Sequence, residues 1–299
     1  MHGLGEVPIT EQPPTVGAPA NEGTSAAAAI GRAGRNLPVA LAVGLTLGGL
    51  VLGTLYTFKP AFLGVVAAAI LVGMWELVRA LQQKGMHAPF APLAVGVCFI
   101  LALGYSSGRE AMTVAMLLTA AAVVVWRLAE GAPGLLADLG AGLLCLVYVA
   151  FLAGFCALLL APHDGDRRVT AFIATVVASD VGGYAFGVLF GKHLMAPVIS
   201  PKKSWEGFAG STLACATCGA LLVHLLLHGA WWQGVVFGLA TVCTATLGDL
   251  GESMIKRDIG IKDMGSLLPG HGGVMDRLDS LLPTAPVAWL LLSAFVPVK

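Results

Sequence analysis

The chain has 299 residues, of which 57% are hydrophobic and only 11% are charged, and its mean hydropathy is +0.84. Soluble globular domains are about 45–50% apolar, so this composition excludes an ordinary soluble domain and predicts a protein embedded in a lipid bilayer. The formal net charge is zero, which argues against a nucleic-acid partner.

The first 36 residues are rich in Ala, Gly, Pro and Thr and show no hydrophobic periodicity. Residues 1–36 are therefore predicted to form a disordered tail. They do not follow the pattern of a cleavable signal peptide, because Arg32 and Arg35 precede a full-length apolar span. Residues 37–299 are expected to form an integral membrane catalytic domain.

From residue 37 onward, apolar stretches recur with about the length that a helix needs to cross the hydrocarbon core, roughly 20 residues. They predict an all-α fold, a polytopic bundle of about nine transmembrane helices. The expected spans are residues 37–56, 60–78, 92–105, 111–128, 135–160, 170–190, 208–227, 231–247 and 281–296. All six cysteines lie in apolar runs, and for the pair Cys215 and Cys218 packing is favoured over metal binding because no second pair accompanies it.

The distribution of Lys and Arg predicts the orientation. With the N-terminus in the cytoplasm, twelve of the 17 Lys and Arg residues fall on the cytoplasmic side, as the positive-inside rule requires. This orientation places the polar segments 191–206 and 249–280 in the cytoplasm. We therefore expect a multi-pass protein of the cell membrane (the plasma or inner membrane) whose active site faces the cytoplasm.

The first polar segment contains SPKKSWEG, residues 200–207. Lys202 and Lys203 are adjacent cations after a proline, and Glu206 suits the positive end of the helix that follows. One interpretation is a positive-inside loop before a helix. Ser200 and the rest of the motif favour a contact with a phosphate or a nucleotide instead.

The second polar segment begins with a predicted helix that places Asp249 and Glu252 on one face and Lys256 one turn further on. A solvated interfacial helix is the alternative interpretation. The glycines of the following HGG sequence would let backbone amides approach a polyphosphate closely. Asp276 and Asp279 then lead into the last span, and carboxylates at the membrane edges of two helices are suited to bind a hard divalent cation through oxygen.

Asp180 lies near the middle of the sixth expected span, in SDVGGYAFG. A charged residue in the bilayer centre costs roughly 2.5–3.5 kcal/mol on insertion scales, so Asp180 is expected to face a wet cavity or a basic partner. Gly183 and Gly187 would allow another helix to approach closely. Glu76 and Arg79, at the inner end of the second span, are expected to form a snorkelling pair outside the active centre.

The sequence GDLGESMIKRDIGIKDMGSLLPGHGGVMDRLDS, residues 248–280, resembles the signature of the phosphatidate cytidylyltransferases, also called CDP-diacylglycerol synthases. That signature has a serine, a Lys-Arg pair, a Lys-Asp pair, HGG and D-R-x-D. SPKKSWEG and the Asp180 stretch resemble the family's upstream motifs. The residues in matching places are Ser253, Lys256, Arg257, Lys262, Asp263, His271, Gly272, Gly273, Asp276, Arg277 and Asp279.

The resemblance implies transfer of CMP from CTP to phosphatidic acid, with a divalent metal, usually Mg²⁺, held by Asp249 and Asp276, and it suggests a homodimer. The expected catalytic residues are Asp249, Asp276, Lys256, Arg257, Lys262 and His271. The expected substrate-binding residues are Asp180, Ser200, Lys202, Lys203, Glu206, Gly272, Gly273, Arg277 and Asp279.

The chemistry agrees with this assignment. A phosphate monoester, with a second pKa of about 6, is already an anion at neutral pH, so the reaction needs metal and cations rather than a general base. A CTP-dependent polyprenol kinase, which transfers the terminal phosphoryl group instead, is the main alternative. A transporter would be expected to have two inverted halves, whereas the polar motifs here lie in the C-terminal half, and a structural scaffold would not need an HGG loop between paired acids.

Overall fold

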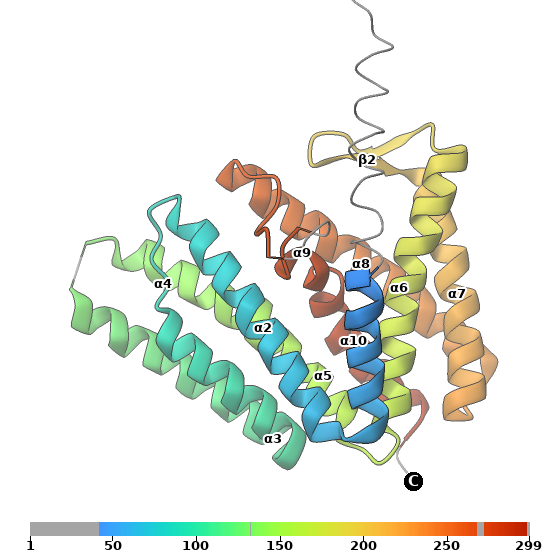
Figure 1. Ribbon diagram of the computed structural model, residues 1–299, viewed down its shortest axis with the longest axis horizontal. Helices are drawn as coiled ribbons and strands as arrows, with labels where there is room; N and C mark the ends of the chain where they lie inside the picture. The colour runs from blue at the N-terminus through green and yellow to red at the C-terminus, as the bar shows by residue number, and fades with distance from the viewer. Residues whose placement is uncertain (1–41, 132, 268–271, 298–299) are drawn as a thin grey trace, which may run out of the picture.

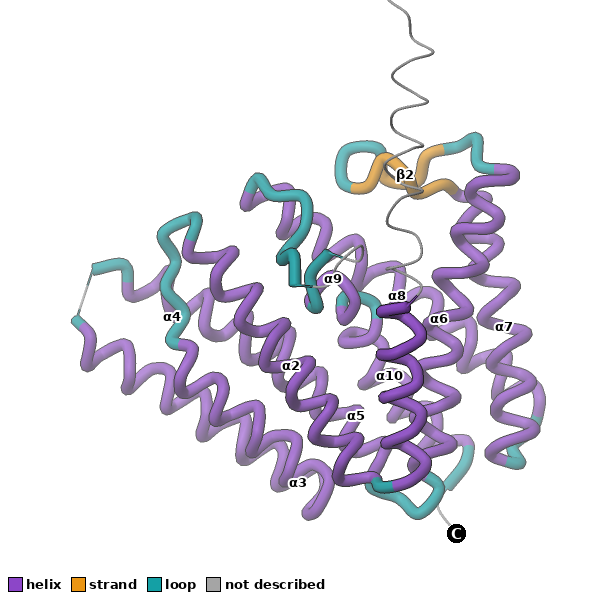
Figure 2. The backbone as a smooth tube through the Cα atoms, in the orientation of Figure 1, coloured by secondary structure: helices purple, strands orange, loops and turns teal. Residues whose placement is uncertain are grey.

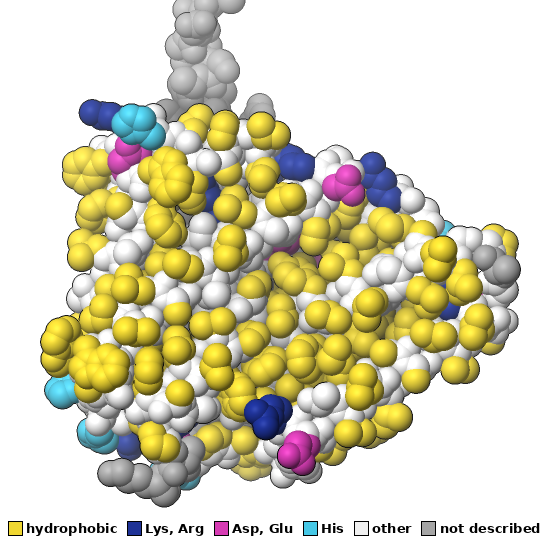
Figure 3. Space-filling view, turned by 180° about the vertical axis from the view of Figure 1, so that it is seen from behind, with side chains coloured by type: hydrophobic (Ala, Val, Ile, Leu, Met, Phe, Trp, Pro, Cys, Tyr) yellow, Lys and Arg dark blue, Asp and Glu magenta, His cyan; other side chains and the backbone are white. Residues whose placement is uncertain are grey.

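The computed structural model describes residues 42–131, 133–267 and 272–297. The predicted tail and His271 lie outside the described residues. Helices make up nearly all of the described chain, and the all-α prediction is confirmed (Figure 2). Apolar side chains cover most of the face shown in Figure 3, and the charged side chains gather toward its two ends, as expected of a membrane-embedded surface.

After an apolar helix at Ala42–Thr57, the elements follow in chain order. They are α2 (Lys59–Gln82), α3 (Phe90–Glu130), α4 (Leu135–Leu144), the π-helix η1 (Cys145–Phe151), α5 (Leu152–Leu160), α6 (Gly165–Phe190), β1 (Leu194–Ala196), β2 (Ser200–Ser204), α7 (Trp205–Leu227), α8 (Trp231–Ile259), α9 (Met275–Leu278) and α10 (Leu281–Phe295).

Local sequence explains several helix ends. Pro60 lies in the first turn of α2, where a missing backbone N–H costs nothing. The Ser204 side chain accepts a hydrogen bond from the Gly207 amide at 3.1 Å and so caps α7. Gly260 ends α8 with a φ of 85°, a conformation that suits glycine.

Within the described residues, seven helical segments are long and apolar enough to cross a membrane, and the Ala42–Thr57 helix is apolar but shorter. Segments α4, η1 and α5 form one of the seven, Leu135–Leu160, and α9 and α10 form another, Met275–Phe295. These helices confirm a polytopic membrane bundle. The count of nine spans and the cytoplasmic N-terminus stay predictions.

Helix α3 reverses direction at Gly108, where φ is 81° and ψ is −167° (Figure 1). The expected spans 92–105 and 111–128 lie on either side of this residue. The two halves fold back on each other so closely that a Cβ atom on Gly96 would overlap Thr119. The reversal therefore depends on a backbone conformation that is essentially restricted to glycine.

The remaining helices bring distant parts of the sequence together. Helix α7 packs against both α6 and α8, and a Cβ atom on Gly182 of α6 would lie 2.7 Å from the carbonyl oxygen of Gly210 of α7. Helix α10 contacts α5, α6 and α8. The short antiparallel hairpin of β1 and β2 lies over one end of α6, α7 and α8 (Figure 1). The segment that carries Asp276 and Asp279 consequently contacts α2 and α8, which come from distant parts of the sequence.

The backbone of Gly108 generates a stability prediction. We expect Gly108→Ala to destabilise the protein by about 1–3 kcal/mol, because the new side chain must adopt a strained conformation. Gly64→Ala is the matched control, since a Cβ atom there meets nothing within 4 Å and the helix interior favours alanine. Thermal unfolding in detergent should show a lower Tm only for Gly108→Ala, and equal Tm values for the two variants would contradict the strain argument.

Candidate active site

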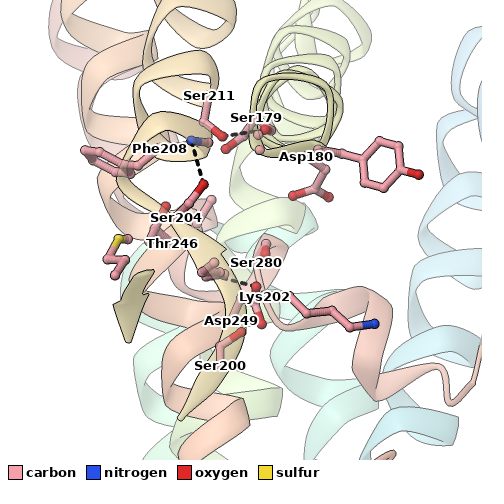
Figure 4. A pocket seen from close by; sticks show the side chains of 17 residues that line it. Ser179, Asp180, Ser200, Lys202, Ser204, Phe208, Ser211, Thr246, Asp249 and Ser280 are labelled. Atoms are coloured by element: carbon pink, nitrogen blue, oxygen red, sulfur yellow. Dashed lines mark hydrogen bonds and ion pairs between the residues drawn. The ribbon is translucent and has the colours of Figure 1, made fainter. Parts of the chain in front are cut away.

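A cavity of about 330 Å³ lies between α6, the β2–α7 segment and α8 (Figure 4). The polar residues that line it are Ser179, Asp180, Ser200, Lys202, Lys203, Ser204, Ser211, Thr246, Asp249 and Ser280, together with Tyr184. Five expected site residues are among them, from segments far apart in the sequence. The fold thus brings the Asp180 stretch, SPKKSWEG and the start of the second polar segment to one cavity.

An ion pair joins the two polar segments directly. Lys203 Nζ on β2 lies 2.6 Å from Asp249 Oδ2 on α8, and Ser253 Oγ donates to Asp249 Oδ1 at 3.3 Å. Both partners of the pair are partly buried, so the interaction is less screened than one on an open surface. The hairpin is therefore tied to α8 at the edge of the cavity.

A second set of charges lies beside the first. Lys256 Nζ lies 3.2 Å from Glu252 Oε2 and 2.8 Å from Asp276 Oδ1. Asp276 Oδ2 also accepts hydrogen bonds from the amides of Gly273, at 2.9 Å, and Met264, at 3.1 Å. The Asp276 carboxylate thus closes the loop between α8 and α9 and fixes it to α8 through Lys256.

Glu252 and Asp279 are two further carboxyl groups in this region. The Glu252 side chain is fully buried, and its Oε1 atom has no hydrogen-bond donor among the described residues. The Asp279 carboxyl group lies beside it and accepts the Ser280 amide at 2.6 Å. Carboxylate oxygens in excess over paired cations are the donors that a hard divalent cation prefers.

The donor set therefore fits Mg²⁺ chemically. Within the described ranges, no three His, Cys, Asp or Glu side chains are already arranged as a ligand cluster. Magnesium does not need such a cluster, because it is commonly held by one or two carboxylates together with water and substrate phosphates.

Tyr148 is a candidate site residue that the sequence patterns did not single out. It lies on η1, and π-helical turns occur frequently at functional sites. Its hydroxyl group is buried without a hydrogen-bond partner among the described residues, near the carboxylates of Glu252, Asp279 and Asp249. A lone tyrosine in an apolar span has no motif that would have identified it.

Other expected site residues lie away from the cavity. Glu206 accepts the amides of Lys192, at 3.1 Å, and His193, at 3.2 Å, and its Oε1 lies 2.6 Å from His193 Nδ1. These contacts tie Glu206 to the hairpin, and its expected contact with substrate stays a prediction. Arg257 is exposed and donates to the Ile199 carbonyl at 3.4 Å.

The remaining expected site residues lie after α8, in the loop and in α9. Lys262 and Asp263 are exposed, and Arg277 is exposed and engaged in an interaction within the protein. Gly272 has a φ of 82°, and the amide of Gly273 bonds Asp276 as described above.

The expected pair of Glu76 and Arg79 is wrong. The Arg79 guanidinium stacks over the Trp75 ring, 4.5 Å from its centroid. Glu76 is only 2% exposed and accepts the Met275 amide at 2.8 Å. The cation–π contact keeps Arg79 at the surface of α2, whereas Glu76 points into the protein.

Fold and site together define a polytopic membrane protein with a cavity built from acidic and basic side chains. The cytidylyltransferase family matches residues 39–295, and the chain belongs to this family. The phosphatidate cytidylyltransferase of Mycobacterium leprae is 45% identical over 279 residues, which cover 88% of this chain and 89% of the relative. The protein of the same name from Mycobacterium tuberculosis is 42% identical over 275 residues, 88% of this chain and 84% of the relative.

A more distant relative agrees. The phosphatidate cytidylyltransferase of Brucella melitensis is 31% identical over 264 residues, 82% of this chain and 91% of the relative. These similarities confirm the resemblance inferred from the motifs and the assignment to the nucleotidyltransferase class.

The unpartnered Tyr148 hydroxyl generates a prediction with two parts. Tyr148→Phe removes a buried group that lacks a partner, so the Tm should stay constant or rise. If the hydroxyl donates to a bound substrate, cytidylyltransferase activity should fall on the order of tenfold. Tyr56→Phe is the control, because the Tyr56 hydroxyl already bonds Thr170 Oγ1 at 2.8 Å, and it should leave activity unchanged. Full activity of Tyr148→Phe would remove Tyr148 from the site.

Proposed function

We propose that this protein transfers CMP from CTP to phosphatidic acid, giving CDP-diacylglycerol and pyrophosphate. The observation that carries the proposal is the junction of the two polar segments, where Lys203 pairs with Asp249 at 2.6 Å on the edge of one cavity. The chain's membership in the cytidylyltransferase family and its 45% sequence identity with the M. leprae protein support the same activity.

The reaction joins two anions. An oxygen of the lipid phosphate attacks the α-phosphorus of CTP, and the bond from that phosphorus to the oxygen bridging to the β-phosphate breaks. The electron pair leaves with pyrophosphate. The lipid phosphate is already ionised, so catalysis consists of positioning and of stabilising negative charge, which suits Lys202 and Lys203 on β2 and Lys256 on α8.

We propose Mg²⁺ as the cofactor, with Asp249 and Asp276 as its protein ligands. Each aspartate is ion-paired with one lysine, Lys203 or Lys256, so both carboxylates already face cationic groups. When bound, the metal would neutralise charge on the nucleotide phosphates.

An apolar cavity supports a lipid substrate. It has a volume of about 140 Å³, and its lining includes Leu278, Leu281 and Leu282 of the α9–α10 segment. Ser280, in the same segment, lines the charged cavity. The same turn of the chain therefore lines a charged cavity and an apolar one, which suits a substrate with a phosphate headgroup and acyl chains.

We further propose that the site faces the cytoplasm, where CTP is available, in the cell membrane, and that the protein acts as a homodimer. The excess of Lys and Arg on the expected inner side supports the orientation. The resemblance to the phosphatidate cytidylyltransferases supports the dimer.

The metal proposal predicts the effect of removing single charges. Asp249→Asn and Asp276→Asn should each lower activity on the order of 100-fold or more while the protein stays folded, because an amide cannot replace an anionic ligand. Asp258→Asn is the control, since Asp258 is exposed on the same helix as Asp249. The variants are compared by magnesium titration and size-exclusion chromatography. Wild-type activity in Asp276→Asn would overturn its role.

The position of the label in CTP distinguishes the cytidylyltransferase from a CTP-dependent lipid kinase. With CTP labelled at the α-phosphorus, we expect label to enter the chloroform-soluble fraction in step with pyrophosphate release. Transfer should require both Mg²⁺ and phosphatidic acid. A kinase would leave the α-label in water as CDP and move the γ-phosphorus to the lipid, so that result would refute the proposed function.

A further inference from the structure

Glu76 joins the first half of the bundle to the loop that leads into α9, the helix that carries Asp276. It lies on α2, 199 residues before Met275, whose amide donates to Glu76 Oε2 at 2.8 Å. Outside this contact, the polar motifs of the proposed reaction lie in the C-terminal half of the chain. The contact is therefore a long-range connection between α2 and the active-site loop.

The environment of Glu76 is unusual for a carboxylate. The side chain is only 2% exposed, and Oε1 has no hydrogen-bond partner among the described residues. Among those residues, no Lys, Arg or His forms an ion pair with it. Arg79, one turn further along α2, stacks on Trp75 instead. Burial of an unpaired carboxylate is costly, so stability alone gives little reason for a glutamate at this position.

Two glycines of the loop make room for Glu76. A Cβ atom on Gly265 would overlap its carboxylate, and a Cβ atom on Gly273 would lie 2.7 Å from Oε2. Gly265 follows Met264 and Gly273 precedes α9, so Glu76 touches both limbs of the loop. The same two limbs supply the Met264 and Gly273 amides that bond Asp276.

We propose that Glu76 is a positioning residue, which holds the two limbs of the loop so that Asp276 stays opposite Lys256. The Glu76 carboxylate fills the space beneath the loop, and the Asp276 carboxylate binds the loop amides and Lys256 Nζ, the latter at 2.8 Å. The expected effect on catalysis rests on the proposed function, because Asp276 is its proposed metal ligand.

The packing of Glu76 against Gly265 allows a double-mutant test. Glu76→Ala and Gly265→Ala should each lower kcat on the order of 100-fold and raise the Mg²⁺ concentration needed for half-maximal rate, because each displaces the loop. In the double variant the added methyl group no longer meets the carboxylate. The double variant should therefore lose as much activity as Glu76→Ala alone, rather than the product of the losses in the two single variants. Glu76→Gln keeps one acceptor oxygen for the Met275 amide and should recover part of the activity.

Control measurements separate positioning from general damage. Glu110→Ala changes an exposed glutamate and should leave kcat and the Mg²⁺ requirement unchanged. Hydrogen exchange at the Met275 amide should accelerate in Glu76→Ala, and this readout does not depend on activity. If the wild-type protein fails to convert phosphatidic acid, the proposed function fails, while faster exchange at Met275 still supports the contact.

Two results would overturn the positioning role. One is wild-type kcat and Mg²⁺ requirement in a folded Glu76→Ala protein. The other is multiplicative losses in the double variant. If Glu76→Ala does not fold, the folded Glu76→Met protein decides the question, because it keeps most of the side-chain volume but has no oxygen to accept the Met275 amide, so unchanged exchange at Met275 and an unchanged Mg²⁺ requirement in this variant would contradict the proposal.

Discussion

The compensation of buried negative charge governs the structure of this site. Glu252 is fully buried in an apolar bundle, where an uncompensated carboxylate would cost several kcal/mol. Lys256 Nζ lies 3.2 Å from Glu252 Oε2 and 2.8 Å from Asp276 Oδ1, so one ammonium group connects α8 with α9. The Lys203–Asp249 pair connects the hairpin with the same helix. Removing either lysine would therefore disturb the geometry of the loop or hairpin as well as the charge.

Close backbone packing makes these contacts possible. Gly182 and Gly210 let α6 and α7 approach within contact of each other's backbones, and Gly248 packs against the Asp279 carbonyl. Small residues serve this purpose in membranes because association there depends on packing rather than on the hydrophobic effect. The polar side chains of three helices consequently reach one cavity without long connecting loops. Such a site requires little reorganisation when a substrate binds.

Sequence patterns predicted the parts that depend on local composition. The helical class follows from long apolar stretches, and a polar environment for Asp180 follows from the cost of isolated charge in lipid. That Lys203 and Asp249 belong to the same site was implied by the resemblance of their motifs. The surroundings of Glu76 and Tyr148 depend on packing between distant helices, which no local pattern encodes. The contacts of Glu206 with the backbone amides of Lys192 and His193 likewise depend on how the hairpin folds, and its motif alone does not encode them.

The balance of charge around α8 and α9 also bears on substrate binding. Lys203 and Lys256 are each paired with carboxylates, which would repel a polyanion if the lysines were absent. Asp279 adds a further acid beside Glu252. A nucleotide triphosphate that entered alone would compete with Asp249 and Asp276 for the same ammonium groups. A divalent cation that entered with the nucleotide would relieve this competition, because the carboxylates and the phosphates would then share the cation. On the proposal that Mg²⁺ accompanies the nucleotide, the acids of the site would disfavour the bare nucleotide and favour its metal complex.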